Sequence, residues 1–352
     1  MPVLKHKMIT KPANKVIRPL QIDLASGKLE TSRESNLRFL IRDAADQLCQ
    51  VVDGNLDFVV RVAESDDDVD KLLLLVNFVM AAARRSVDEL REAHLRLEEE
   101  LTAARKLQEQ LLPQTLPRAR NVRVAARCVP ARAVGGDFFD FVRYPRSGLC
   151  VGILADVSGK GAAAAIYAAL ASGIVRSLAQ HEPSPSEMLE KLNKSLFTRA
   201  PEGRFVALTY STWDDDRFVL EICNSGLPEP LLCRNGSVRS LAVHGLPLGL
   251  FPDAEYQSLR LQCEPGDTLL FYTDGVVESL DRYGNEFGIE RLSRIVLNNC
   301  SSDADAVVDA VVNEVSAHCS CDFNFDDQTV IAVKVLHPRT ETGARTGPGV
   351  FQ

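Results

Sequence analysis

The order of apolar and polar residues divides the chain into a helical part and a mixed part. Over residues 31–112 apolar side chains recur at helical spacing with no proline and a single glycine, Gly54, which indicates helices with a break between them. After residue 120 the apolar residues fall in short alternating or continuous runs, such as VRVAARCV and LCVGILAD, which are typical of strands. The sequence therefore predicts a helical N-terminal region followed by a domain of helices and strands.

The segment VDELREAHLRLEEELTAARKLQEQLLP has an apolar residue at every seventh position. This repeat is formed by Leu90, Leu97, Ala104 and Leu111, with Val87 and Leu101 on the companion seam. His94 and Gln108 interrupt the seams, and Pro113 ends the helix. Two interpretations are open: a short coiled coil that joins two chains through residues 87–112, or an amphipathic connector within one chain.

Paired helices stand among consecutive short strands in the mixed part. Helices are predicted for GAAAAIYAALASGIVRSLAQ and SPSEMLEKLNKSLFTRA, and again at about residues 287–298 and 303–318. The further segments predicted as strands are RFVALTYSTW, DRFVLEIC, LLCR, GSVRSL, YQSLRLQC, DTLLFYTD and QTVIAVKV. This order favours an α+β fold with largely antiparallel sheets over the strict alternation of a doubly wound fold.

Composition and charge narrow the class of protein. Of the 352 residues, 45% are hydrophobic and 25% charged, as in soluble globular proteins. The net charge of −8 argues against nucleic-acid binding, which needs a basic surface. The most apolar run, LLLLVNFVMAAA at residues 72–83, is shorter than the about 20 residues of a membrane span. Scattered cysteines and the lack of a signal-peptide pattern favour a cytoplasmic protein with reduced thiols.

Acidic residues stand at the ends of apolar strands or beside glycine in four motifs. These are GGDFFD with Asp137 and Asp140, LADVSGKG with Asp156, FYTDGVVE with Asp274 and Glu278, and FDDQTV with Asp326 and Asp327. We expect these carboxylates to emerge together at one edge of the sheets. Two unit charges about 4 Å apart repel by about 4 kcal/mol at an effective dielectric of 20, so protons or cations must compensate them. Oxygen ligands with no histidine in the motifs indicate Mg²⁺ or Mn²⁺ rather than zinc.

Each motif alone has a simpler explanation. Asp274 and Gly275 form a common turn pair, and Ser158 is a candidate helix cap. LADVSGKG is not a phosphate-binding loop, because Gly161 follows Lys160 where that loop needs Ser or Thr. Four such acids at strand ends are not explained in this way, which favours a shared site.

The ordered motifs resemble those of a known family. VGGDFFD, ADVSGKGAAAA, NSGLPEP, GLPLGL, YTDGVVE and FDDQTV occur in the order seen in the PPM-type metal-dependent serine/threonine phosphatases. The chain is most similar to their SpoIIE-like bacterial branch, which includes regulators of sigma-factor partner switching. The resemblance covers residues 118–336 and implies an αββα sandwich, in which two antiparallel sheets lie between helix pairs.

The resemblance also implies roles for five residues. Asp156 would bridge two Mn²⁺ or Mg²⁺ ions, and the backbone carbonyl of Val157 would bind one of them. The other ion would be held by Asp137, Asp274 and Asp326. The resemblance assigns no role to three further acids, Asp140, Glu278 and Asp327.

Two positions depart from the family pattern. Leu227 stands where many members of this branch have histidine, and the motifs contain no arginine for the substrate phosphate. Neither departure affects the acids expected to bind metal.

The resemblance implies a phosphatase for phosphoserine or phosphothreonine in a protein, such as an anti-sigma-factor antagonist in a bacterial partner switch. The expected segments are a flexible basic tail (1–30), a helical regulatory domain (31–86) that answers an unidentified activator, a helical or coiled-coil connector (87–117), the phosphatase domain (118–336) and a disordered tail (337–352). A catalytically silent phosphatase-like binding module and a phosphohydrolase for small molecules are the alternatives.

Overall fold

The structure is a computed structural model that describes residues 68–113, 119–198, 203–319 and 326–337, and a few isolated positions. The expected basic tail, residues 31–67 of the expected regulatory domain apart from isolated positions, and residues 338–352 of the expected C-terminal tail lie outside the described residues. The chain divides into two compact units, Met1–Arg96 and Leu97–Gln352.

Helix α2 (Asp68–Leu111) is a single helix of 44 residues that crosses the boundary between the two units. It includes both the apolar run at residues 72–83 and the heptad segment, and it ends before Pro113 as predicted. Leu90, Leu97 and Leu111 of the heptad repeat are more than half exposed. An exposed seam fits a dimer as well as a connector, so the predicted dimer stays a prediction.

The first of two sheets has five antiparallel strands in the order β1-β10-β9-β6-β7. Their bounds are β1 Val122–Val129, β6 Leu231–Arg234, β7 Ser237–Ser240, β9 Thr268–Tyr272 and β10 Gln328–Val335. Strand β10 lies between β1 and β9, with Ala332 opposite both Ala125 and Leu270.

The second sheet is also antiparallel, with the order β2-β3-β4-β5-β8. Its strands are β2 Phe138–Arg143, β3 Cys150–Val157, β4 Val206–Asp214, β5 Val219–Ser225 and β8 Ser258–Gln262. Strands β3 and β4 are buried along nearly their whole length. Burial on both faces explains why the sequence of β3 is a nearly continuous apolar run rather than an alternating one.

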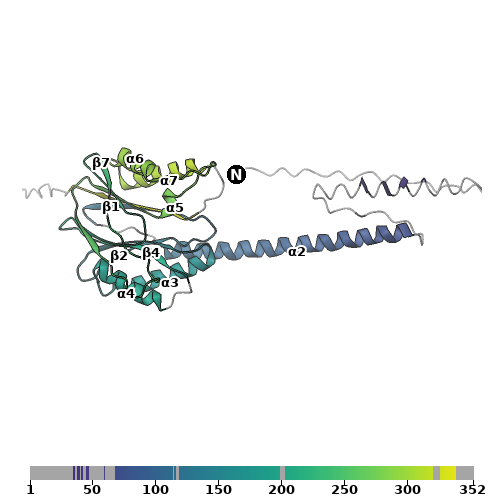
Figure 1. Ribbon diagram of the computed structural model, residues 1–352, viewed down its shortest axis with the longest axis horizontal. Coiled ribbons are helices and arrows are strands. Elements are labelled where there is room, and N and C mark those ends of the chain that lie inside the picture. The colour runs from purple at the N-terminus through teal and green to yellow at the C-terminus, as the bar shows by residue number, and fades with distance from the viewer. Residues whose placement is uncertain are drawn as a thin grey trace, which may run out of the picture. The chain divides into compact units, whose positions relative to one another are not determined.

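Helices cover the outer face of each sheet, and together the layers form the predicted αββα sandwich (Figure 1). Helices α3 (Ala162–Ala179) and α4 (Pro185–Phe197) pack on the second sheet, and α6 (Ile289–Asn299) and α7 (Ala304–His318) on the first. A third hydrophobic cluster joins the inner faces of the two sheets, with Leu154, Ile222 and Leu269 among its members.

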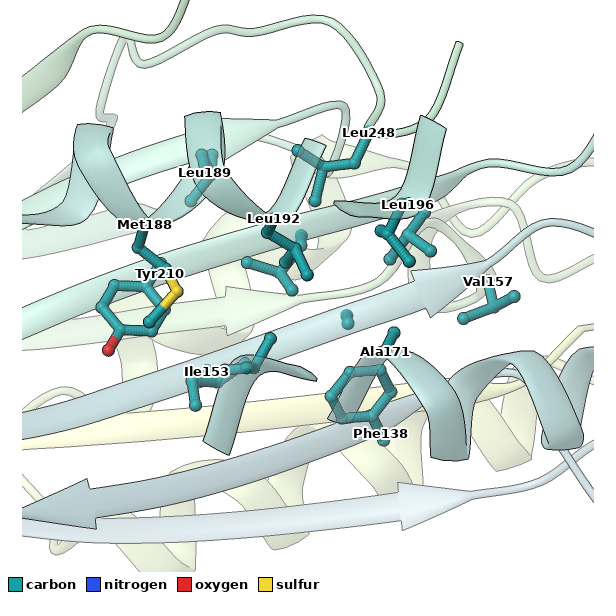
Figure 2. Close-up of a cluster of buried hydrophobic side chains, with 14 of the residues drawn as sticks. Phe138, Ile153, Val157, Ala171, Met188, Leu189, Leu192, Leu196, Tyr210 and Leu248 are labelled. Carbon is teal, nitrogen blue, oxygen red and sulfur yellow. The ribbon is translucent and has the colours of Figure 1, made fainter. Parts of the chain in front are cut away.

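The core beneath α4 shows why its sequence forms an amphipathic helix. Met188, Leu189, Leu192 and Leu196 are fully buried and point toward the strands that carry Ile153 and Tyr210 (Figure 2). The helix starts with a capping box, in which Ser184 accepts from the backbone of Glu187 and the Glu187 carboxylate accepts from the backbone of Ser184.

Helix α3 is apolar and 18 residues long, so by length and composition it is the one described helix that could cross a membrane. Its inner face is buried in the core: Tyr167, Ala171 and Val175 pack there with the residues of α4. The buried helix of a folded domain has the same composition.

Candidate metal centre

The five residues predicted to bind metal lie at the ends of four strands, two in each sheet. Asp137 immediately precedes β2, and Asp156 and Val157 end β3. In the other sheet, Asp274 follows β9 as the first residue of the one-turn helix α5 (Asp274–Val277), and Asp326 lies just before β10. Antiparallel pairing within each sheet brings one strand's start beside its neighbour's end: Phe138 pairs with Ala155, and Tyr272 with Val330.

Asp137 links the two sheets through its carboxylate. Its Oδ2 accepts hydrogen bonds from Thr273 Oγ1 at 2.8 Å and from Thr329 Oγ1 at 2.6 Å, although Asp137 itself leads into the second sheet. The side chain is 4% exposed. Burial, followed by the negative charges of Asp156 and Asp327, raises the pKa of Asp137 well above its ordinary value, and the two threonine hydroxyls offset part of this shift.

Asp156 and Asp274 are affected by the same accumulation of negative charge. Burial first, and then the charges of Asp274 and Asp326, raises the pKa of Asp156 to about 7. Burial and the charge of Asp326 likewise raise the pKa of Asp274. The predicted carboxylates are therefore close enough to interact, and their mutual repulsion is the property that a bound cation removes.

The side chains of these acids do not all converge on one point. Among the described residues, no group of three or more His, Cys, Asp or Glu side chains is arranged to hold a metal. Asp326 is instead paired with Lys160, with 2.9 Å between Lys160 Nζ and Asp326 Oδ2, and both side chains are nearly half exposed. The donors still fit Mg²⁺ or Mn²⁺ in kind, because they are oxygen atoms of carboxylates whose charges repel.

Asp327 organises the backbone next to this cluster. Its Oδ1 accepts from Ala131 N at 2.7 Å, and its Oδ2 accepts from Gly136 N at 2.6 Å. A Cβ at Gly135 would lie 2.3 Å from Asp327 Oδ2, so Gly135 must be glycine for the carboxylate to approach. Both carboxylate oxygens of Asp327 are therefore engaged by the turn before Asp137.

Asp140 does not join the cluster. It is buried within β2, and its two oxygens accept hydrogen bonds from Arg176 of α3, from Nε at 2.6 Å and from Nη2 at 2.9 Å. This bidentate pair attaches α3 to the second sheet. Glu278 lies one turn after Asp274, and burial and the charge of Asp274 raise its pKa.

The loop after Asp156 is held against the start of β4. Ser158 N donates to Phe205 O at 3.0 Å, and Phe205 N donates to Ser158 Oγ at 2.9 Å. Arg204 Nη1 donates to Ser158 O at 2.5 Å, and its guanidinium occupies the space that a side chain at Gly159 would need. Ser158 is therefore not the cap of α3, since the cap position is Gly161.

Sequence reasoning missed four residues of this region: Gln108, Arg204, Thr273 and Thr329. Thr273 and Thr329 lie inside the acidic motifs FYTDGVVE and FDDQTV, and Gln108 interrupts the heptad seam, whereas Arg204 had no local signal. Leu227, which departs from the family pattern, is buried in the cluster between the sheets, and its backbone bonds to the side chain of Asn224.

Known proteins are similar to this chain in sequence and in fold. The model of the Stage II sporulation protein E (SpoIIE) family matches residues 147–336. "Phosphoserine phosphatase RsbU" of Bacillus subtilis is 26% identical over 277 residues, which cover 77% of this chain and 76% of RsbU.

Two solved structures show the same fold. The SiaA-PP2C domain of Pseudomonas aeruginosa aligns with a TM-score of 0.61 at 18% identity, over 69% of this chain and 98% of that domain. The PP2C phosphatase domain of SpoIIE from Bacillus subtilis, solved with a fragment of its regulatory domain, aligns with a TM-score of 0.55 at 18% identity, over 77% of this chain and 96% of that one. Because the family model matches more than half of its residues, this chain belongs to the SpoIIE family of PPM-type phosphatase domains.

Proposed function

We propose that this SpoIIE-family protein phosphatase is metal-dependent and hydrolyses phosphoserine or phosphothreonine in a protein. The observation that carries the proposal is the cluster of Asp137, Asp156, Asp274 and Asp326 at strand ends of both sheets. Within it, burial and mutual repulsion raise the pKa values of Asp137, Asp156 and Asp274. Such a cluster destabilises the folded chain unless it takes up protons or cations, and at neutral pH a bound cation is the compensation that leaves the carboxylates ionised, so its presence favours a metal site.

The chain offers ligands for two Mn²⁺ or Mg²⁺ ions. Asp156 would contact both ions and the Val157 carbonyl one of them, while Asp137, Asp274 and Asp326 would hold the other. When bound, such ions lower the pKa of water and neutralise charge on the phosphoryl oxygens. The threonine hydroxyls on Asp137 Oδ2 fix the orientation of its carboxylate.

In the proposed reaction a water oxygen bonds to phosphorus while the bond from phosphorus to the serine or threonine oxygen breaks, and that oxygen takes up a proton. No covalent intermediate on the chain is involved. Cys128 is close enough to Asp137 to be affected by its charge. Burial and the charge of Asp137 raise the pKa of the Cys128 thiol to about 12, so this cysteine is not a thiolate nucleophile at neutral pH.

Two substitutions test this proposal. Asp156→Ala and Asp274→Asn should abolish Mn²⁺-dependent phosphate release from a phosphopeptide, and EDTA should do the same to the unaltered chain. Asp309→Asn is the matched control, because Asp309 is an exposed acid that pairs with Arg127 on the surface. Near-normal turnover by both site variants would overturn the assignment.

The alternative, a catalytically silent phosphatase-like binding module, makes a different prediction. Such a module would bind a phosphoprotein but release no phosphate at any Mn²⁺ concentration. Tests with phosphopeptides and with nucleotides would in turn separate a protein phosphatase from a phosphohydrolase for small molecules.

The proposed substrate is a phosphoserine on an anti-sigma-factor antagonist. The support is the similarity to RsbU, whose name describes a phosphoserine phosphatase, and the motif order of the partner-switching branch. On this proposal the chain acts in the cytoplasm. Dephosphorylation of candidate antagonist proteins encoded near this gene would test it.

The helical region before the phosphatase domain is proposed to regulate it, in response to an activator yet to be identified. A fragment of residues 118–352 should then show basal activity that the activator of the full chain does not change. If the fragment and the full chain respond alike, the regulatory role is wrong. Dimerisation through residues 87–112 belongs to the same proposal, and sedimentation of the full chain with and without Leu97→Lys would test it.

A further inference from the structure

Gln108 is the partly buried residue in an exposed stretch of α2. The residues on either side of it, 105–107 and 109–111, are exposed. Its side chain makes two hydrogen bonds to a single residue, Gly135: Gln108 Nε2 donates to Gly135 O at 2.7 Å, and Gly135 N donates to Gln108 Oε1 at 3.1 Å. All of these residues belong to the unit Leu97–Gln352.

The contact lies beside the start of β2 and the middle of α3. A small cavity there is lined by Gln108, Leu112, Phe138 and Ala168, among others. The last turn of α2 therefore meets the phosphatase domain next to the residues that follow Asp137.

The turn that Gln108 contacts is held by hydrogen bonds rather than by packing of its own side chains. Gly135 and Gly136 have no side chains, and a Cβ on either would lie under 3.0 Å from its neighbours. Gln108 binds both backbone groups of Gly135, and Asp327 Oδ2 accepts from Gly136 N. Two side chains from distant parts of the chain thus fix the backbone that leads directly into Asp137.

Because two adjacent glycines are conformationally free, this turn would lose its order without those partners. An ordered turn matters for metal binding, since groups that orient a ligand without contacting the ion strongly affect metal affinity. A primary amide has a donor and an acceptor side by side, so it can bind the N–H and the C=O of one residue together, which an ionised carboxylate or an apolar side chain cannot do.

We infer that Gln108 is a positioning residue for the metal centre: it holds the Gly135–Gly136 turn so that Asp137 is placed to bind an ion, and any movement of the last turn of α2 breaks both hydrogen bonds together. The metal part of this inference rests on the proposed function. The two hydrogen bonds to Gly135 explain why the polar Gln108 interrupts the apolar seam, since its amide is used within the chain.

The full chain with Gln108→Leu tests the inference, because leucine is of similar size and favours helix but forms neither hydrogen bond. Gln110→Leu is the matched control: it is the same substitution, two residues further along the helix, at an exposed position. Gln108→Glu is a second variant of the same shape, in which an acceptor replaces the donor that faces Gly135 O.

The first measurement is amide hydrogen exchange in metal-free protein. Gln108→Leu should speed exchange of the peptide that covers residues 131–138 by about tenfold, the effect expected for loss of its restraining hydrogen bonds. Exchange in β10, and in the Gln110→Leu control, should match the unaltered chain. Unchanged exchange at residues 131–138 in both Gln108 variants would overturn the inference, whether or not the chain binds metal.

The second measurement is calorimetric titration with Mn²⁺, followed by phosphate release at increasing Mn²⁺. Gln108→Leu should weaken Mn²⁺ binding by about tenfold. The maximal rate at saturating Mn²⁺ should stay within about twofold, because the residue orients a ligand and does not contact the substrate. An equal Mn²⁺ affinity in both Gln108 variants and the control would overturn the inference. If the unaltered chain neither binds Mn²⁺ nor releases phosphate, it is the proposed function that fails.

Discussion

The carboxylate of Asp327 accepts a hydrogen bond from the backbone N–H of Gly136 at 2.6 Å, across 191 residues of sequence. Its other oxygen accepts from Ala131 N, so the side chain closes the loop before β2 onto the start of β10. Asp326, its neighbour, is nearly half exposed and faces Lys160 instead. Asp327 therefore holds the loop backbone, whereas Asp326 is a partly exposed proposed ligand. Separate substitutions can distinguish these two roles.

We predict that Asp327→Asn lowers the free energy of unfolding by about 1–3 kcal/mol, because the amide that replaces one carboxylate oxygen cannot accept a hydrogen bond and leaves a buried backbone N–H without its partner. Thermal and urea denaturation of the metal-free chain measure this. Asp326→Asn is the control and should change stability by less than about 0.5 kcal/mol, as expected at a partly exposed position, while it abolishes Mn²⁺-dependent activity. Equal stability of the two variants would contradict the division of roles.

We predict that Gly136→Ala disrupts the site by contact with the backbone. A Cβ at Gly136 would lie 2.7 Å from Val157 O and 3.3 Å from Ala164 Cβ, so the end of β3 must shift. Overpacking of this kind costs about 1–3 kcal/mol, and Mn²⁺ binding should be lost because Val157 O is a proposed ligand. Calorimetric titration and thermal denaturation measure the two effects.

Gly173→Ala is the matched control for that substitution. Gly173 lies inside α3, with no heavy atom within 4 Å of the position of an added Cβ. Alanine favours helix over glycine, so the free energy of unfolding should rise by about 0.5–1 kcal/mol, with Mn²⁺ affinity unchanged. Loss of Mn²⁺ binding in this control would show that any change of glycine disturbs the domain, and the contact argument would fail.

We predict that Asp140→Asn weakens the fold without affecting the metal site. The substitution breaks the bidentate pair with Arg176 and leaves a buried polar group partly unsatisfied, which costs about 1–3 kcal/mol. Arg176→Lys should reproduce part of the loss, because lysine cannot make the bidentate contact. Denaturation measures stability, and titration should give an unchanged Mn²⁺ affinity. A weakened Mn²⁺ affinity at unchanged stability would instead place Asp140 in the site.

The acids proposed as ligands could be found from sequence because each stands at the end of an apolar strand or beside glycine. A carboxylate at the end of a buried run such as LCVGILAD is energetically unfavourable unless something compensates its charge. A single metal site explains the acids of all four motifs. The α+β fold with antiparallel sheets could be predicted from the order of strands and paired helices. The main local difference is the short helix that begins at Asp274, where a turn was the simpler expectation.

The partners of those acids could not be found in this way. Asp326 and Asp327 are adjacent and chemically identical, and only the three-dimensional contacts with Lys160 and Gly136 distinguish them. Gln108 interrupted a heptad pattern, but its partner Gly135 lies 27 residues further along the chain. Sequence periodicity records which face of an element is apolar and contains no information on which polar groups meet.

The raised pKa of Asp156 gives a prediction for the stability of the metal-free chain. Its value of about 7 in the folded chain compares with 3.8 for an ordinary aspartate, so between these values the folded state binds more protons than the unfolded state. The free energy of unfolding therefore falls as the pH rises. This contribution is fully present below about pH 4 and is lost as the pH passes through 7, and Asp137, whose pKa is also raised, acts in the same direction.

Thermal denaturation in EDTA at pH 5.5 and 7.5 measures this effect. The unaltered chain should lose more stability between these two pH values than Asp156→Asn, which has no carboxyl to titrate there. Each pKa unit is worth about 1.4 kcal/mol, so a difference on the order of 1–3 kcal/mol is expected. When Mn²⁺ replaces EDTA, the unaltered chain should no longer lose this stability at pH 7.5, since an ion stabilises the charged carboxylates. Parallel losses of stability in the two proteins would show that Asp156 is not held in a repulsive cluster.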